Sequence, residues 1–319
     1  MIATRLTNQL GLRHPVVSAP MAKAAGGRLA AAVTQAGGLG LLGGGYGDAA
    51  WLKAERSAAG DTRVGVGFIT WALSDAVLDD ALAADPAVLM LSFGDPARFA
   101  ARIHNAGVPL MCQVQTIDHA KAALDAGAQY IVAQGAEAGG HGASRATMTL
   151  APEVADLLAL RAPEAVLLAA GGIADGRGLA AAIMLGAEGA LVGSRFWASA
   201  EALVHPNMVA AAARATGDDT IRSTVMDIAR RLDWPPGYTA RVLRNAFTDR
   251  WHDDLSGLLA AAETEAPRYA AAWEAGDTTT ANTFVGEATG LIHDAPPASQ
   301  VIDDMTRQAA HLLGGGWQR

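Results

Sequence analysis

The feature that most constrains the fold is a repeated pair of segments, a short apolar run followed by an alanine-rich stretch. Most of the runs are continuously apolar, which is typical of parallel strands that are covered on both faces. We expect eight strands, at residues 15–20, 39–42, 64–68, 88–93, 110–114, 130–133, 166–170 and 190–193.

The alanine-rich stretches have the composition of helices, as at residues 28–36, 96–106, 117–126 and 178–185. They are followed by Gly37, Gly107, Gly127 and Gly186, where the chain needs a left-handed residue to leave a helix. Eight such units predict an α/β fold, a (β/α)8 TIM barrel. A doubly wound sheet would need a GxGxxG turn after the first strand, and residues 20–27 lack that spacing.

The composition excludes several classes of protein. With 319 residues, 51% of them hydrophobic, the chain can bury a large core, and its net charge of −8 disfavours nucleic acid and anionic membranes as partners. Cys112 is the single cysteine, so we expect no disulfide within the chain and no metal site built on cysteines, and no metal is implied. Because no signal peptide or membrane span is recognisable, we expect a cytoplasmic protein.

The character of the chain changes after Phe196. Residues 199–290 carry more charge, helical runs at 202–215, 224–232 and 255–275, and a break at Trp234-Pro235-Pro236-Gly237. No strand is expected there, so we interpret this segment as a helical insertion or lid. The predicted domains are a barrel at 1–198, the insertion at 199–290, and a C-terminal helix within 291–319 that returns to the barrel.

The most specific chemical signal is the loop at residues 134–143, where His141 lies between Gly140 and Gly142. Glycine lets the backbone approach a flat ligand, and imidazole is a base near neutral pH. The interval from the sixth strand to the seventh is also longer than most, and barrels place their chemistry in the loops after strands. The alternative is a flexible, solvated loop in which the histidine has no role. The combination of Gln-Gly with Glu-Ala-Gly-Gly-His in residues 134–141 is too specific for that interpretation.

Two further loops have the pattern of a phosphate site. Gly171 and Gly172 follow the seventh expected strand, and Gly193 and Ser194 follow the eighth. Barrels commonly bind a cofactor phosphate at these two loops, because backbone amides and a helix N-terminus supply donors without bulk.

The loop at 134–143 resembles the flavin-and-base loop of nitronate monooxygenases, formerly called 2-nitropropane dioxygenases. It is also similar to the FMN-dependent enoyl-acyl-carrier-protein reductases and to some NAD(P)H:quinone reductases. The resemblance is strong over residues 15–21 and 113–196 and weaker over 241–247. It implies that the barrel binds FMN and that His141 is catalytic.

The cofactor-binding residues predicted from this resemblance, from strand position and from the loop pattern are Ala19, Pro20, Met21, Gly67, Gln113, Gln134, Gly135, Gly139, Gly140, Gly171, Gly172, Leu191, Val192, Gly193 and Ser194. The chain departs from the family pattern at Gly67, where nitronate monooxygenases commonly carry an asparagine. We expect the missing amide to leave room for a differently shaped substrate or a water molecule, with Phe68 and Trp71 as walls of the pocket.

Three functions remain open from the sequence. The first is oxidation of alkyl nitronates by dioxygen, giving a carbonyl compound and nitrite, with His141 accepting a proton or binding the nitro group. The second is an FMN-dependent reductase that takes hydride from NAD(P)H and reduces a quinone or an enoyl thioester. The third is a barrel that binds flavin or a phosphate metabolite as a sensor, without turnover.

Overall fold

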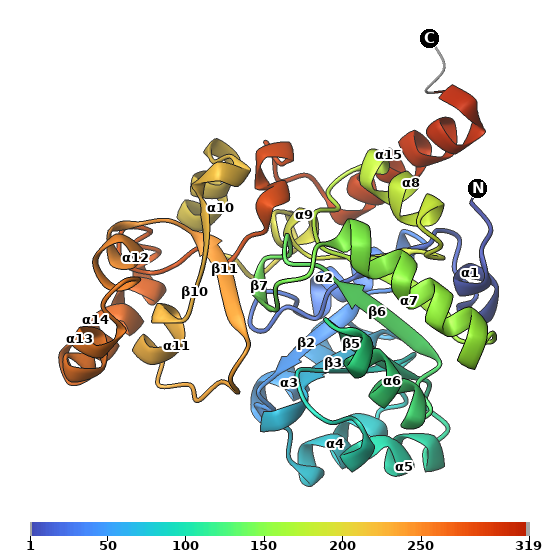
Figure 1. Ribbon diagram of the computed structural model, residues 1–319, viewed down its shortest axis with the longest axis horizontal. Helices are drawn as coiled ribbons and strands as arrows, with labels where there is room; N and C mark the ends of the chain where they lie inside the picture. Colours follow the sequence, from blue (N-terminus) through green and yellow to red (C-terminus); the bar gives the residue numbers. More distant parts are fainter. Residues whose placement is uncertain (1, 317–319) are drawn as a thin grey trace.

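A computed structural model of the chain describes residues 2–316 and contains the expected barrel (Figure 1). Its strands run parallel in the order β1-β9-β8-β6-β5-β4-β3-β2. An isolated parallel bridge between Val17 and Leu39 joins the two edges, so the sheet closes on itself. The barrel strands are β1 (Val16–Ser18), β2 (Leu41–Gly45), β3 (Gly65–Ile69), β4 (Leu89–Ser92), β5 (Leu110–Val114), β6 (Tyr130–Gln134), β8 (Val166–Ala170) and β9 (Ala190–Val192).

Helices surround the barrel and alternate with its strands, which confirms the (β/α)8 prediction (Figure 1). The four glycines that were expected to end helices have positive φ angles, between 70° at Gly107 and 97° at Gly37. The surrounding helices are α2 (Gly27–Gln35), α3 (Ala49–Ala58), α4 (Asp75–Leu82), α5 (Ala97–Asn105), α6 (Ile117–Asp125), α7 (Thr147–Arg161), α8 (Gly176–Met184) and α15 (Ala298–His311).

The barrel has two apolar layers. Alternate strand residues such as Leu41, Met90 and Leu168 fill the interior, and Leu6 of α1 (Arg5–Leu10) packs into the same cluster. The remaining strand residues pack outward against the helices. This double burial explains why the strands are apolar along their whole length.

The expectation of a purely helical segment at 199–290 is wrong. This segment contains β10 (Thr220–Ser223) and β11 (Thr239–Leu243), which pair antiparallel, and β11 also pairs with β7 (Gly140–Gly142) of the His141 loop. Both strands are short and alternate polar with apolar residues, a weaker signal than the runs of the barrel. We keep the name insertion for residues 199–290.

The insertion also contains helices, which lie to one side of the barrel in Figure 1. The run expected at 224–232 is a short helix, and the run at 255–275 is two helices that meet at Ala261. The helices here are α10 (Pro206–Arg214), α11 (Val225–Ala229), α12 (Ala246–Trp251), α13 (Leu255–Ala260) and α14 (Ala262–Ala275). The insertion also contains the helical turn η2 (Gly217–Asp219), and η3 (Glu287–Leu291) spans its end. The remaining helical turns are η1 (Thr70–Ala72), α9 (Ser194–Trp197) and η4 (Leu312–Gly316).

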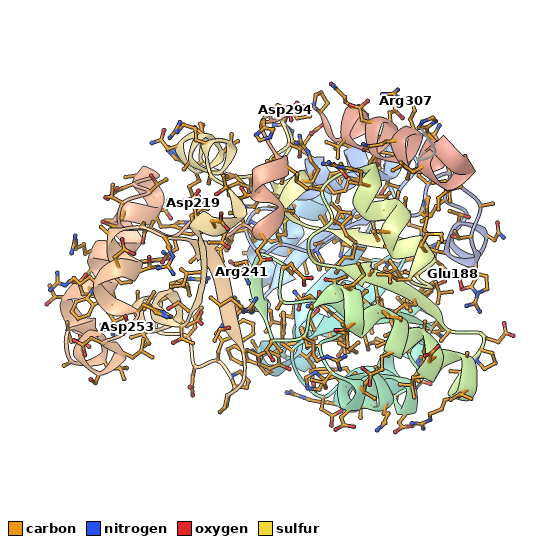
Figure 2. All side chains as sticks on the ribbon, turned by 45° about the horizontal axis from the view of Figure 1, so that its top comes forward. Glu188, Asp219, Arg241, Asp253, Asp294 and Arg307 are labelled. Carbon is orange, nitrogen blue, oxygen red and sulfur yellow. The ribbon has the colours of Figure 1, made fainter. Side chains whose placement is uncertain are left out.

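After the insertion the chain returns to the barrel, where α15 packs against α8 and α2. The domain limits 1–198, 199–290 and 291–319 stay a prediction, and residues 1 and 317–319 lie outside the described residues. Charged side chains such as Asp253, Asp294 and Arg307 lie on the outside, whereas Arg241 lies on β11 where the insertion meets the barrel (Figure 2).

The packing of the barrel interior predicts how a substitution there changes the free energy of unfolding. Leu168→Ala removes a fully buried side chain from the centre of the barrel and should lower the free energy of unfolding by about 2–5 kcal/mol, because a cavity remains. Leu160→Ala on α7 is the matched control: this side chain is 85% exposed, and its loss should change stability by less than about 0.5 kcal/mol. Urea unfolding of the two variants measures the difference, and equal effects would contradict the assignment of the interior core.

Candidate active site

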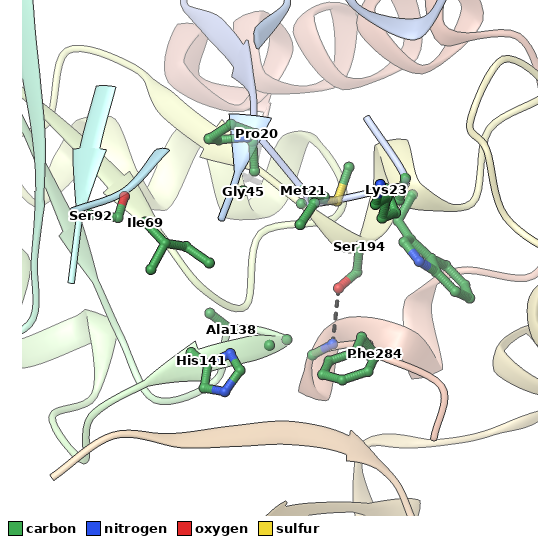
Figure 3. A pocket seen from close by; sticks show the side chains of 18 of the residues that line it. Pro20, Met21, Lys23, Gly45, Ile69, Ser92, Ala138, His141, Ser194 and Phe284 are labelled. Carbon is green, nitrogen blue, oxygen red and sulfur yellow. Dashed lines mark hydrogen bonds between the residues drawn. The ribbon is translucent and has the colours of Figure 1, made fainter. Parts of the chain in front are cut away.

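The loops at the carboxyl ends of the barrel strands, together with the insertion, enclose a cavity of about 500 Å³. This volume lies within the range of small-molecule and cofactor sites, about 300–1,000 Å³. His141 lines the cavity (Figure 3). The other predicted site residues that line it are Ala19, Pro20, Met21, Gly67, Gln113, Gln134, Gly139, Gly140, Gly171, Gly172, Leu191, Gly193 and Ser194.

Two predicted cofactor residues do not line the cavity. The Val192 side chain packs outward in the layer between strands and helices, because neighbouring residues of a strand point to opposite faces. Gly135 faces α7: a Cβ atom there would lie 2.0 Å from Thr147 Oγ1 and 2.3 Å from Glu137 Oε2. Gly135 is therefore required for the close packing of the loop against α7.

Two residues of the insertion contact the imidazole of His141, one through a hydrogen bond and one through ring stacking. Its Nε2 atom lies 3.0 Å and 3.1 Å from the two carboxylate oxygens of Asp227 on α11. The indole of Trp234 stacks on the ring, with centroids 3.4 Å apart and planes within 6°. Both His141 and Asp227 are nearly buried, with side chains 8% and 4% exposed.

The hydrogen bond to Asp227 sets the tautomer of His141. A carboxylate accepts hydrogen bonds, so Nε2 carries the hydrogen and Nδ1 is left as the basic nitrogen. Burial lowers the pKa of His141 below its ordinary value of 6.5; the Asp227 carboxylate opposes this shift, and Arg230 and Arg222 add to it. His141 is therefore a neutral base at pH 7.

Backbone pairing positions the same loop. Residues 140–142 form a strand with β11, in which His141 lies opposite Ala240. The Gln134 side chain donates to the His141 carbonyl at 3.0 Å and accepts from Gln115 at 2.9 Å. The loop is thus a strand of a small sheet, and the interpretation of a flexible, solvated loop is excluded.

Two arginines of the small sheet bind one carbonyl group of the loop. Arg222 Nη1 and Arg241 Nε donate to the Ala136 carbonyl at 3.1 Å and 3.0 Å. Burial, together with the neighbouring Arg241, lowers the pKa of Arg222 to about 10. Arg241 also pairs with Glu287 at 2.7 Å, so this charge cluster ties the loop to β10, β11 and η3.

The two glycine loops lie beside each other at the cavity. Gly171 and Gly172 have φ angles of 102° and 74°, which favour glycine. A Cβ atom at Gly193 would meet only Ala19 and Met21, at 3.8 Å and 3.9 Å. Ser194 Oγ accepts from the Gly286 amide at 2.9 Å, which leaves the hydroxyl hydrogen free to be donated (Figure 3).

The expected extra room at Gly67 is not there. A Cβ atom on this residue would lie 2.4 Å from Cγ of Pro20, so the proline ring fills the place that an asparagine side chain would need. Phe68 lines the cavity as expected. Trp71 does not; its ring packs against Tyr46 and Trp234, with centroids 5.8 Å and 5.5 Å away.

Asp227 and Trp234, which contact His141 most directly, are not among the residues predicted from the sequence. A signal for Asp227 was present, since it is the only charge within the apolar run 225–229, and a buried charge needs a partner. Trp234 was noted only as part of a break between helices. Its stacking on His141 depends on the path of the chain across the barrel, which has no local signature.

Within residues 2–316, no cluster of three or more His, Cys, Asp and Glu side chains is placed to hold a metal ion. The same part of the chain has no helix long and apolar enough to cross a membrane. Cys112 is buried, and burial raises the pKa of its thiol to about 12, so it is not a nucleophile.

Comparisons with known proteins identify the family. A sequence profile described as nitronate monooxygenase matches residues 3–62 and 54–308. A nitronate monooxygenase from Neurospora crassa is 33% identical, over 94% of this chain and 90% of the relative. A Mycobacterium tuberculosis protein named (3aS,4S,5R,7aS)-5-hydroxy-7a-methyl-1-oxo-octahydro-1H-indene-4-carboxyl-CoA dehydrogenase is 33% identical, over 78% of this chain and 68% of the relative.

The solved structure of FabK from Thermotoga maritima is similar over 99% of both chains, with a TM-score of 0.86 and 30% identity. The relatives are enzymes of oxidation and reduction, and the profile and the Neurospora relative each cover nearly the whole chain. The chain therefore belongs to the nitronate monooxygenase family of oxidoreductases.

Proposed function

We propose that the cavity binds FMN and that the protein oxidises alkyl nitronates with dioxygen, releasing nitrite and a carbonyl compound. The observation that carries this proposal is the neutral, buried imidazole of His141, held by Asp227 and Trp234 at the wall of a cofactor-sized cavity. Family membership supports the same reaction.

The residues at the cavity fit FMN. The flat, side-chain-free surfaces of Gly172 and Gly193, with the Ser194 hydroxyl, offer donors to a phosphate at the two loops where barrels commonly bind one. The amides of Gln113 and Gln134 also line the cavity, with Gln134 paired to Ala170 beside the Gly171 loop, and they suit the carbonyl and N–H groups of a flavin ring. Met21 and the 19–20 segment would lie against the ring.

When bound, a flavin accepts two electrons from the substrate and passes them to dioxygen. The protein's own contribution is to orient the substrate and to manage its charge. Nδ1 of His141 is the ring nitrogen that is free to accept the proton on the carbon next to nitrogen of a neutral nitroalkane, which converts that nitroalkane to its nitronate. Once protonated, the same nitrogen can bind the nitro group of the nitronate. Trp234 covers one face of the imidazole and so limits the access of water to it.

A second candidate keeps FMN but reduces a quinone or an enoyl thioester with NAD(P)H. The similarity to FabK and to a dehydrogenase whose name includes a coenzyme A thioester favours this alternative. Because the relatives are enzymes, a sensor without turnover is the weakest of the three hypotheses.

One experiment separates the two enzymatic candidates. The purified protein should be yellow, and under anaerobic conditions an alkyl nitronate should bleach the flavin absorbance while NADH and NADPH should not. The flavin spectrum is recorded after each addition. Bleaching by a pyridine nucleotide, with no response to nitronates, would refute the proposed function and support the reductase.

His141 should contribute to turnover and not to flavin binding. His141→Ala should keep the flavin but slow turnover by about 10²–10⁴-fold, the usual loss when acid–base assistance is removed. His141→Asn, which cannot take the proton, should be nearly as slow. If Asn retains most of the rate, His141 binds an anion; if both variants lose the flavin, its catalytic assignment is wrong.

Asp227 should control the basicity of His141. Because burial lowers the pKa of His141, the kcat/KM of the wild type for a neutral nitroalkane should stay high at neutral pH and fall only below pH 6.5, as the base becomes protonated. Asp227→Asn removes the carboxylate that raises this pKa and can donate to Nε2, which leaves Nδ1 protonated. We expect a loss of about 10²-fold or more.

The residual activity of Asp227→Asn should fall off at a lower pH than in the wild type. The exposed Asp233→Asn in the same segment is the matched control and should keep the wild-type pH profile. An acidic limb above pH 6.5 in the wild type, or an unchanged profile in Asp227→Asn, would contradict this role.

A further inference from the structure

The cavity extends beyond the barrel into the insertion. This part, which we call the insertion pocket, is formed by residues before and on α10, residues of α14, and the chain before η3. The residues that define it are Leu203, Val204, Met208, Tyr269, Trp273 and Phe284.

Most of the walls of the insertion pocket are apolar, and His205 and Glu274 are the polar residues that line the cavity beside Val204 and Trp273. Met208 and Tyr269 are almost fully buried, and the rings of Trp273 and Phe284 pack edge to face with centroids 5.8 Å apart. The Tyr269 hydroxyl donates to the Asn282 side chain and accepts from its amide, both at 3.1 Å. Its polar group is therefore satisfied within the protein, and the pocket presents mostly carbon to a ligand.

Two cationic side chains line the cavity, Lys23 and Arg230, and Lys23 pairs with Asp48 at 2.8 Å. Arg230, at the end of α11, lies between the rings of Tyr46 and Phe284, with its guanidinium 5.8 Å and 5.7 Å from the two ring centroids. Among residues 2–316 it forms no ion pair, whereas the neighbouring Arg231 lies 3.0 Å from Glu263. The nearest carboxylate along its helix, Asp227, is bound to His141.

An apolar pocket beside an unpaired guanidinium is chemically suited to an amphipathic ligand. Burial of a hydrocarbon chain against these walls is favourable, and a guanidinium binds carboxylate and phosphate groups through charge-assisted hydrogen bonds. A nitroalkane of two or three carbon atoms, held at His141, would use neither feature.

We propose that the insertion pocket binds the apolar chain or ring system of an elongated substrate, and that Arg230 binds an anionic group on that substrate. This proposal rests on the proposed function only in placing the reacting group at His141. The substrate class is then an extended apolar molecule that carries a carboxylate or a phosphate, and not a short nitroalkane.

Binding without turnover tests the proposal. Straight-chain carboxylates from butanoate to decanoate are titrated into the purified flavoprotein by calorimetry, with the primary alcohol of each length in parallel. Affinity for the carboxylates should rise about fourfold for each added methylene group, as expected when a chain is buried. Alkyl phosphates of the same lengths show which anion Arg230 prefers.

Arg230→Gln should weaken decanoate binding by about 10- to 100-fold, the usual value of a hydrogen bond between charged groups, and change decanol binding less than twofold. Arg231→Gln is the matched control, because it removes the same charge from the next residue, whose side chain does not line the cavity. It should leave both affinities unchanged.

Affinities that do not depend on chain length would overturn the proposal, as would equal effects of Arg230→Gln and Arg231→Gln. The result is independent of the reaction. If nitronates fail to bleach the flavin but chain length and Arg230 control binding, the proposed function is wrong and the substrate class stands.

Discussion

The candidate active site depends on the pairing of β7 with β11. This pairing makes the His141 loop the third strand of a sheet whose other two strands belong to the insertion. His141 thus belongs to a loop of the barrel, but backbone hydrogen bonds from β11, a segment about 100 residues later in the chain, fix its position. Loops that carry catalytic groups are usually mobile, and strand pairing removes that freedom.

The second constraint is electrostatic. A buried imidazole and a buried carboxylate each lose hydration, and each is stable there because the other supplies a hydrogen bond. Desolvation outweighs the attraction of Asp227, so the pKa of His141 is lowered and the ring stays neutral. The same hydrogen bond selects the tautomer, which is why Asp227 matters to the chemistry although it does not line the cavity.

The barrel and the insertion contribute different kinds of residues to the site. The barrel contributes glycine loops and amides in a pattern that many barrels share for phosphate-bearing cofactors. The insertion contributes Asp227, Trp234, Arg230 and the apolar walls of the insertion pocket. The proposed cofactor binding therefore rests on the common scaffold, whereas the environment of His141 and the proposed choice of substrate depend on the insertion.

The sequence by itself determined the barrel and its eight strands, and most of the site residues predicted from it line the cavity. The reason is that continuous apolar runs and helix-ending glycines are local signals, and the carboxyl ends of parallel strands must meet at one end of a barrel. Only the tertiary structure decided the rest: the strands of the insertion, the pairing of His141 with Asp227, the stacking of Trp234, and the filling of the space at Gly67 by Pro20. Each of these is a contact between segments far apart in the chain, and such contacts leave no periodic pattern in the sequence.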